Sequence, residues 1–199
     1  MKTRVKICGI TNLNDALDAI NAGASALGFV FYKPSARYIK PEDSRKIIEA
    51  LPPFVQSVGL FVNEDADFIN SVCKISKISL AQIIDDENIV DFNALNIKYL
   101  KVARVKSKED LKKLEDDYYL VDAFVDEFGG AGKRLALEWF ENIDCSKFIL
   151  AGGLSSENLN ELKGFGFFGV DVSSGVEKEK AKKDKQKMID FIKEANEIA

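Results

Sequence analysis

Residues 27–31 read Leu-Gly-Phe-Val-Phe, an unbroken apolar run, and residues 148–151 form a second one, Phe-Ile-Leu-Ala. Strands with one wet face alternate polar and apolar residues. Unbroken apolar strands are instead typical of parallel sheets, because helices cover both faces there. The two runs therefore predict a parallel sheet under helices.

Eight strand-like runs alternate with segments of helical period. They cover residues 4–8, 26–31, 56–62, 78–84, 99–105, 120–126, 147–151 and 168–172. Eight such units predict an α/β fold, a (β/α)₈ TIM barrel formed by residues 1–199 as a single domain. At 199 residues the chain lies near the lower size limit of about 200 for this fold, so we expect short loops and reduced helices, above all in residues 85–95. A doubly wound open sheet is the alternative, but Cys8-Gly9-Ile10-Thr11 stands where its glycine fingerprint belongs.

Three segments show helix signals. Residues 13–20 place Leu13, Ala16, Leu17 and Ile20 on one face, and Gly23 is positioned to end that helix. Ser155 or Ser156 is expected to cap a helix over residues 157–163, in which Leu159 and Leu162 share a side. Near the C-terminus, Met188, Ile192 and Ala195 line one face of a final helix.

Composition narrows the class of protein. The chain is 46% apolar and 30% charged, with a net charge of −4 and a pI near 5.1, which gives no electrostatic case for binding nucleic acid or a membrane surface. Neither a secretory leader nor a spanning segment is expected. Three scattered Cys and no His put the usual zinc ligand sets out of reach. We expect a soluble cytoplasmic protein without a metal.

The ends of the last two runs predict a phosphate site. The seventh run leads into Gly152 and Gly153, and the eighth into Ser173, Ser174 and Gly175. Paired glycines let backbone N–H groups approach an anion, and the loops after strands seven and eight form the recurrent phosphate site of this barrel. Each loop alone is equally well explained as an ordinary strand end.

Acid–base chemistry in a chain without His must use other side chains. Cys8 closes the first run, and its thiolate is a natural base, although free Cys is also a common core filler. Asp126 closes the sixth run before Gly129-Gly130-Ala131-Gly132, where a solvated loop carboxylate is the alternative. Since catalytic groups of such barrels lie at the C-terminal strand ends, we expect Cys8 and Asp126 to flank a ligand at the mouth.

Three charged residues complete the candidate site. Arg37, in the loop after the second run, is placed to hold a substrate carboxylate, although a surface role is the default. Lys6 shares a face with Cys8, and Asp171 points inward from the eighth run. Because strands one and eight are neighbours in a closed barrel, we expect a buried ion pair between Lys6 and Asp171.

These motifs resemble the phosphoribosylanthranilate isomerase family of tryptophan biosynthesis. The resemblance rests on residues 6–11, 31–38, 58–63, 151–154 and 169–177, together with Asp126 and its glycine-rich loop, and it spans nearly the whole chain. One departure is Gln82-Ile83-Ile84-Asp85, which stands where the family usually has Gln-Leu-His-Gly.

The resemblance implies a (β/α)₈ barrel that performs an Amadori rearrangement without a cofactor. It implies Cys8 as general base, Asp126 as general acid, Arg37 for the anthranilate carboxylate and Asp171 for substrate hydroxyls. A phosphosugar is the expected partner, and a neighbouring enzyme of the pathway is a further one. The rivals are another phosphosugar barrel, such as an indole-glycerol-phosphate synthase or an epimerase, and a non-catalytic barrel that binds a phosphorylated ligand.

Overall fold

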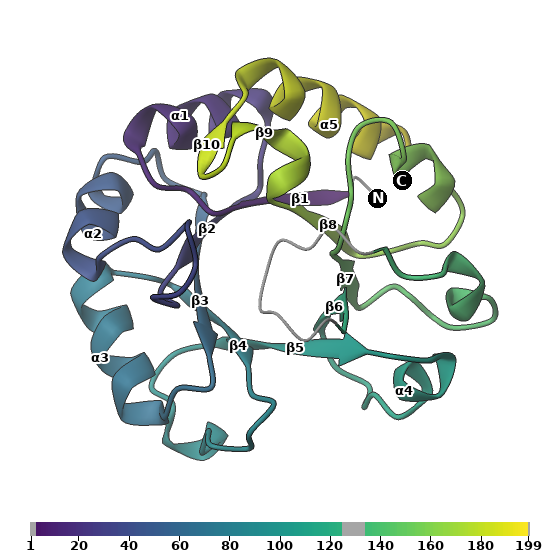
Figure 1. The fold of residues 1–199 in the computed structure, drawn as a ribbon, viewed down its shortest axis with the longest axis horizontal. Helices are drawn as coiled ribbons and strands as arrows, with labels where there is room; N and C mark the ends of the chain where they lie inside the picture. The colour runs from purple at the N-terminus through teal and green to yellow at the C-terminus, as the bar shows by residue number, and fades with distance from the viewer. Residues whose placement is uncertain (1–2, 125–133, 199) are drawn as a thin grey trace.

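Eight parallel strands close into a barrel in the computed structural model, which describes residues 3–124 and 134–198 (Figure 1). The strands are β1 (Arg4–Cys8), β2 (Ala26–Val30), β3 (Gln56–Val62), β4 (Leu80–Ile84), β5 (Tyr99–Val105), β6 (Tyr119–Ala123), β7 (Phe148–Leu150) and β8 (Gly169–Val172). Each strand pairs with the next in the chain, and β8 pairs with β1 to close the ring. The predicted barrel is confirmed, and the open sheet is excluded.

The outer ring is uneven (Figure 1). Its α-helices are α1 (Leu13–Ala22), α2 (Pro41–Glu49), α3 (Ala66–Ser76), the short α4 (Lys108–Lys112) and α5 (Lys185–Glu197). Single 3₁₀ turns at Phe92–Ala94, Leu137–Phe140 and Leu159–Leu162 stand where longer helices would fit. The reduced helices expected for so short a barrel therefore lie mainly in the second half of the chain. A small hairpin, β9 (Glu177–Glu179) and β10 (Lys182–Lys183), separates β8 from α5.

Helix α1 shows how local signals set the element boundaries. The Asn12 side chain caps its start by accepting the Asp15 N–H at 2.9 Å. Gly23 ends it in the left-handed region, at φ 109°, and donates to the Ile20 carbonyl. The predicted role of Gly23 is confirmed, as is the buried face of α5 with Met188, Ile192 and Ala195.

The core has two parts that separate apolar packing from the polar mouth. The larger part fills the space between strands and helices. The smaller part lies inside the barrel and contains Leu100, Leu120 and Ala151, with Leu80, Val102 and Ile149 packed against them. Inward positions repeat every second residue, so Gln82, Arg104, Asp122 and Asp171 follow these apolar residues toward the C-terminal strand ends. The barrel interior is thus filled by apolar side chains near the N-terminal strand ends and lined by polar side chains near the C-terminal strand ends.

Strand six is shorter than predicted. It ends at Ala123 rather than 126, because β5 ends at Val105 and its last carbonyl accepts the Phe124 N–H at 3.0 Å. Asp126, which the sequence places at the end of this run, lies outside the described residues.

The prediction of a helix over residues 157–163 is wrong. Only the 3₁₀ turn Leu159–Leu162 forms, without a capping bond from Ser155 or Ser156. Asn158 instead connects this segment to the loop that follows β7. Its side chain accepts the Ser155 N–H at 3.0 Å and donates to the Gly153 carbonyl at 2.9 Å. Within the described residues, no helix is long and apolar enough to cross a membrane.

Candidate active site

Cys8 lies inside the barrel at the end of β1. Its side chain is buried, with 6% of the residue exposed, and it stands opposite Gly28 of β2. A Cβ on Gly28 would come within 2.8 Å of the Cys8 sulfur. Glycine at that position therefore leaves the space that the sulfur occupies on the inner face of the barrel.

The predicted ion pair between Lys6 and Asp171 is present. The two residues are register partners on β1 and β8, and the Lys6 Nζ lies 2.8 Å from an Asp171 carboxylate oxygen. Burial favours a neutral Lys6, but the charge of Asp171 and contact with the Cys8 sulfur outweigh it and raise the pKa of the ammonium. Lys6 thus joins Asp171 to Cys8 and stays charged beside the sulfur.

Asp122 is the acidic residue that the sequence reasoning missed. It occupies the inward position at the end of β6, where the backbone N–H of Ala123 donates to it at 2.8 Å. Burial raises the pKa of its carboxyl to about 6; the negative charge of Asp171 adds to the shift, while Arg104 and Lys6 oppose it. The signal was the run Tyr119-Leu120-Val121, whose apolar character stops at Asp122.

Arg37 belongs to a buried charge cluster. Its Nε and Nη2 each lie 2.8 Å from an oxygen of Glu177, which is a bidentate pair. The Lys183 Nζ also reaches Glu177, at 2.9 Å, and the Lys183 side chain is completely buried. The sequence predicted a ligand contact for Arg37 but no role for Glu177 or Lys183. Glu177 thus occupies the edge of the guanidinium formed by Nε and Nη2.

The loops after β7 and β8 touch each other beside Cys8. Gly152 and Gly153 both have positive φ, 90° and 62°. A Cβ on Gly175 would fall 2.0 Å from the Leu154 carbonyl oxygen, so only glycine permits the observed approach of the two loops. The Ser173 hydroxyl donates to the Cys8 carbonyl at 3.1 Å. Ser173, one of the residues predicted to bind phosphate, therefore also links the strand-eight loop to β1 through its hydroxyl.

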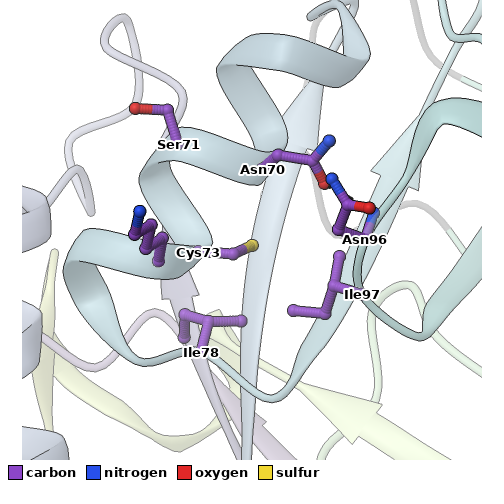
Figure 2. Close-up of a pocket in the computed structure, with 7 residues that line it drawn as sticks. Asn70, Ser71, Cys73, Ile78, Asn96 and Ile97 are labelled. Carbon is purple, nitrogen blue, oxygen red and sulfur yellow. Dashed lines mark hydrogen bonds between the residues drawn. The ribbon is translucent and has the colours of Figure 1, made fainter.

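A groove on the outer wall does not belong to this constellation. It runs between α3 and the start of β5, where Asn70, Cys73, Ile78 and Ile97 line it (Figure 2). Asn70 accepts the Asn96 N–H at 2.8 Å, and burial raises the pKa of the Cys73 thiol to about 12. The Asn70 side chain is thus engaged, and the Cys73 thiol stays protonated. Among the described residues, no group of three Cys, Asp or Glu side chains is placed to hold a metal.

Comparison with known proteins decides the family. A family model for N-(5'phosphoribosyl)anthranilate (PRA) isomerase matches residues 5–194. The chain belongs to this family. Isomerases of this name from a Nitratiruptor species and a Sulfurovum species are 59% and 56% identical to it. The alignments cover 96% and 98% of this chain, and 98% and 100% of the relatives.

Solved structures of the family share the fold. The phosphoribosyl anthranilate isomerase of Thermus thermophilus superimposes with a TM-score of 0.87 at 30% identity, and the alignment covers 99% of this chain and 100% of that one. A second phosphoribosyl anthranilate isomerase was solved in complex with reduced 1-(o-carboxyphenylamino)-1-deoxyribulose 5-phosphate. It superimposes with a TM-score of 0.81 at 38% identity, covering 97% of this chain and 98% of that chain.

The reaction follows from the family. The enzyme converts N-(5'-phosphoribosyl)anthranilate, an N-linked aminoaldose, into the aminoketose 1-(2-carboxyphenylamino)-1-deoxyribulose 5-phosphate, a step of tryptophan biosynthesis. This decides against the rival phosphosugar barrels and against a non-catalytic binding protein. The roles of individual residues are a separate question.

Proposed function

We propose that Cys8 is the general base and Asp122 the general acid of this isomerisation. Protonation of the furanose ring oxygen by Asp122 breaks the bond from that oxygen to C1′, while the nitrogen lone pair forms the C1′=N bond of a Schiff base. The Cys8 thiolate then takes the proton from C2′, and the electrons left behind form C1′=C2′ and return the nitrogen to an amine. The resulting enolamine tautomerises to the ketone by moving its hydroxyl proton to C1′.

The position and pKa of Asp122 carry this proposal. A general acid works best when its pKa lies near the working pH, and a carboxyl with pKa about 6 is still roughly one-tenth protonated at pH 7. Asp122 shares the barrel interior with the Lys6–Asp171 pair that contacts Cys8. Asp126, expected as the acid from the sequence, lies outside the described residues and remains the alternative.

The direct test follows the fluorescence of phosphoribosylanthranilate made in situ. The wild-type enzyme is expected to consume it. Variants at Cys8 or Asp122 are expected to bind reduced 1-(o-carboxyphenylamino)-1-deoxyribulose 5-phosphate while consuming little substrate. Consumption at the wild-type rate in either variant would remove that residue from the catalytic pair.

Arg37 is proposed to anchor the anthranilate carboxylate, and Asp171 to accept hydrogen bonds from sugar hydroxyls. Arg37→Ala is expected to weaken binding of the reduced product by about 1.5–3 kcal/mol, because a charge-assisted contact is lost. A counterpart ligand built from aniline, which lacks the carboxylate, is expected to bind the wild type and the variant alike. Calorimetric titration of both ligands makes the comparison, and equal losses would make Arg37 a structural residue.

The phosphate is proposed to bind where the two loops meet, at Gly152, Gly153, Ser174 and Gly175. Backbone N–H groups are the expected donors, since neither loop contains Lys or Arg. Ser174 is exposed, so Ser174→Asp is expected to place a negative charge near the phosphate without loss of stability. Gly153→Asp adds strain at φ 62°.

Inhibition by inorganic phosphate measures this effect. Phosphate is expected to compete with substrate in the wild type and to compete much more weakly in Ser174→Asp, with an unchanged unfolding midpoint. Unchanged competition in Ser174→Asp and Gly153→Asp would place the phosphate elsewhere.

Cytoplasmic location and association with a neighbouring enzyme of the pathway are also proposed. Cys8, Cys73 and Cys145 are free thiols, which fits a reducing compartment. Fractionation of cells and co-purification under mild conditions would test the two points.

A further inference from the structure

Lys183 is a buried charge that the proposed reaction does not use. The side chain comes from β10, the second strand of the small hairpin, and none of its surface is exposed. Its ammonium has three acceptors: a Glu177 carboxylate oxygen at 2.9 Å, the Ser173 carbonyl at 3.0 Å and the Ser173 hydroxyl at 3.4 Å. Three acceptors match the three donors of a protonated amine.

The backbone around Lys183 holds the side chain in place. Its N–H donates to the Asp15 carboxylate at 2.9 Å, and Thr11 donates from its hydroxyl to the Ala181 carbonyl at 3.0 Å. The hairpin is thereby fastened to α1 and to the loop that precedes it. Removing this charge from water costs free energy, and the neighbouring acceptors must offset that cost.

Glu177 is shared between two cations. Arg37 contacts both carboxylate oxygens, and Lys183 contacts one of them. Burial raises the pKa of Glu177, but the Arg37 hydrogen bonds and the Lys183 charge overcome it and hold that pKa below its usual value. Lys187 bonds the main-chain oxygen of Glu177, at 2.9 Å, and not the carboxylate.

The charges of this cluster decide what Arg37 can bind. Arg37 and Glu177 alone would form a neutral pair, and a substrate carboxylate that approached Arg37 would meet the negative charge of Glu177 close behind it. With Lys183 present, two positive charges face one negative charge, which leaves a net charge of +1. The Lys6–Asp171 pair on the neighbouring strands is neutral, and the charge of Cys8, which acts on both Arg37 and Lys183, is common to all the variants compared below.

We propose that Lys183 is a positioning residue that neutralises Glu177, so that Glu177 fixes the orientation of Arg37 without cancelling its attraction for the substrate carboxylate. Bound substrate then completes a cluster of two cations and two carboxylates. This inference rests on the proposed assignment of Arg37 to the anthranilate carboxylate.

The expected effect is selective for carboxylate ligands. Lys183→Met is expected to weaken the binding of reduced 1-(o-carboxyphenylamino)-1-deoxyribulose 5-phosphate about ten- to a hundredfold. This is the size expected for the loss of one nearby charge at a partly buried site. The affinity for the aniline counterpart is expected to change by less than about twofold, because that ligand carries no carboxylate. In turnover, KM is expected to rise much more than kcat falls. Lys182→Met, at the exposed neighbouring position, serves as the control.

A second substitution separates charge from structure. The double variant Lys183→Met/Glu177→Gln restores a net charge of +1, because the introduced glutamine is neutral and Arg37 is retained. It is expected to bind the carboxylate ligand more tightly than Lys183→Met alone. If Lys183 were merely structural, the double variant would bind no better than the single one. If Lys183→Met does not fold, Glu177→Gln is compared with the double variant instead. These two proteins differ only in the Lys183 charge, so the comparison measures the effect of that charge on ligand binding.

Titration calorimetry with the two ligands therefore tests the inference. Equal weakening of both ligands in Lys183→Met, or no recovery in the double variant, would overturn it. Arg37→Ala distinguishes this failure from a failure of the underlying assignment. If Arg37→Ala discriminates between the ligands and Lys183→Met does not, only the role of Lys183 falls; if neither does, the carboxylate assignment falls as well.

Discussion

Asp122→Asn is expected to increase the free energy of unfolding by about 3 kcal/mol at pH 7, because burial raises the carboxyl pKa from 3.8 to about 6. Ionising such a group costs more in the folded protein than in the unfolded chain. An asparagine carries no charge to desolvate, and its side-chain oxygen still accepts the Ala123 N–H. The residue that makes the proposed chemistry possible is therefore expected to lower stability.

The pH dependence fixes the sign of this effect. A raised folded-state pKa means that the stabilising contribution is present below pH 3.8 and is lost as the pH rises through about 6. The gain from Asp122→Asn is thus expected at pH 7 and absent near pH 3.8. Urea unfolding at both pH values measures it. Asp116→Asn, at an exposed surface pair with Lys147, is the control and is expected to shift stability by less than about 0.5 kcal/mol. Identical unfolding of the wild type and Asp122→Asn at pH 7 would contradict the burial of this carboxyl.

Cys8→Ser is expected to lose about 10²–10⁴-fold in kcat, the usual contribution of a general base, because a hydroxyl ionises far less readily than a thiol. Serine is nearly the same size, so the fold and the affinity for reduced 1-(o-carboxyphenylamino)-1-deoxyribulose 5-phosphate are expected to persist. Steady-state kinetics together with titration of that ligand separate the two effects.

A second buried cysteine provides the matched control. Burial raises the pKa of the Cys145 thiol to about 11, and its sulfur donates to the Ile143 carbonyl, a bond that a serine hydroxyl can also make. Cys145→Ser is expected to keep wild-type turnover. A Cys8→Ser enzyme with near-normal kcat would show that the base lies elsewhere.

Local patterns were enough to predict the barrel and part of its site. Apolar runs and the two-residue alternation along strands placed Lys6, Cys8 and Asp171 on the interior, and strand order made the Lys6–Asp171 pair predictable before any coordinates. The glycines of the strand-seven and strand-eight loops also lie where expected.

Features that depend on pairing or on tertiary contact were not predictable in this way. Nothing in the run of residues 120–126 indicates that β6 ends at Ala123, level with the end of β5, so Asp122 was overlooked. Glu177 and Lys183 lie in a charged run typical of a solvated surface, and only the fold of the β9–β10 hairpin turns them inward against Arg37. Lys182 and Lys183 are adjacent and identical in type, yet one is exposed and the other fully buried.

The proposed acid–base pair is tested most directly by the kcat of Asp122→Asn and Asp126→Asn, measured side by side as consumption of phosphoribosylanthranilate. The proposal predicts that Asp122→Asn loses about 10²–10⁴-fold while Asp126→Asn stays close to the wild type. The reverse order, with Asp122→Asn active and Asp126→Asn inactive, would contradict it and return the acid to the loop that follows β6.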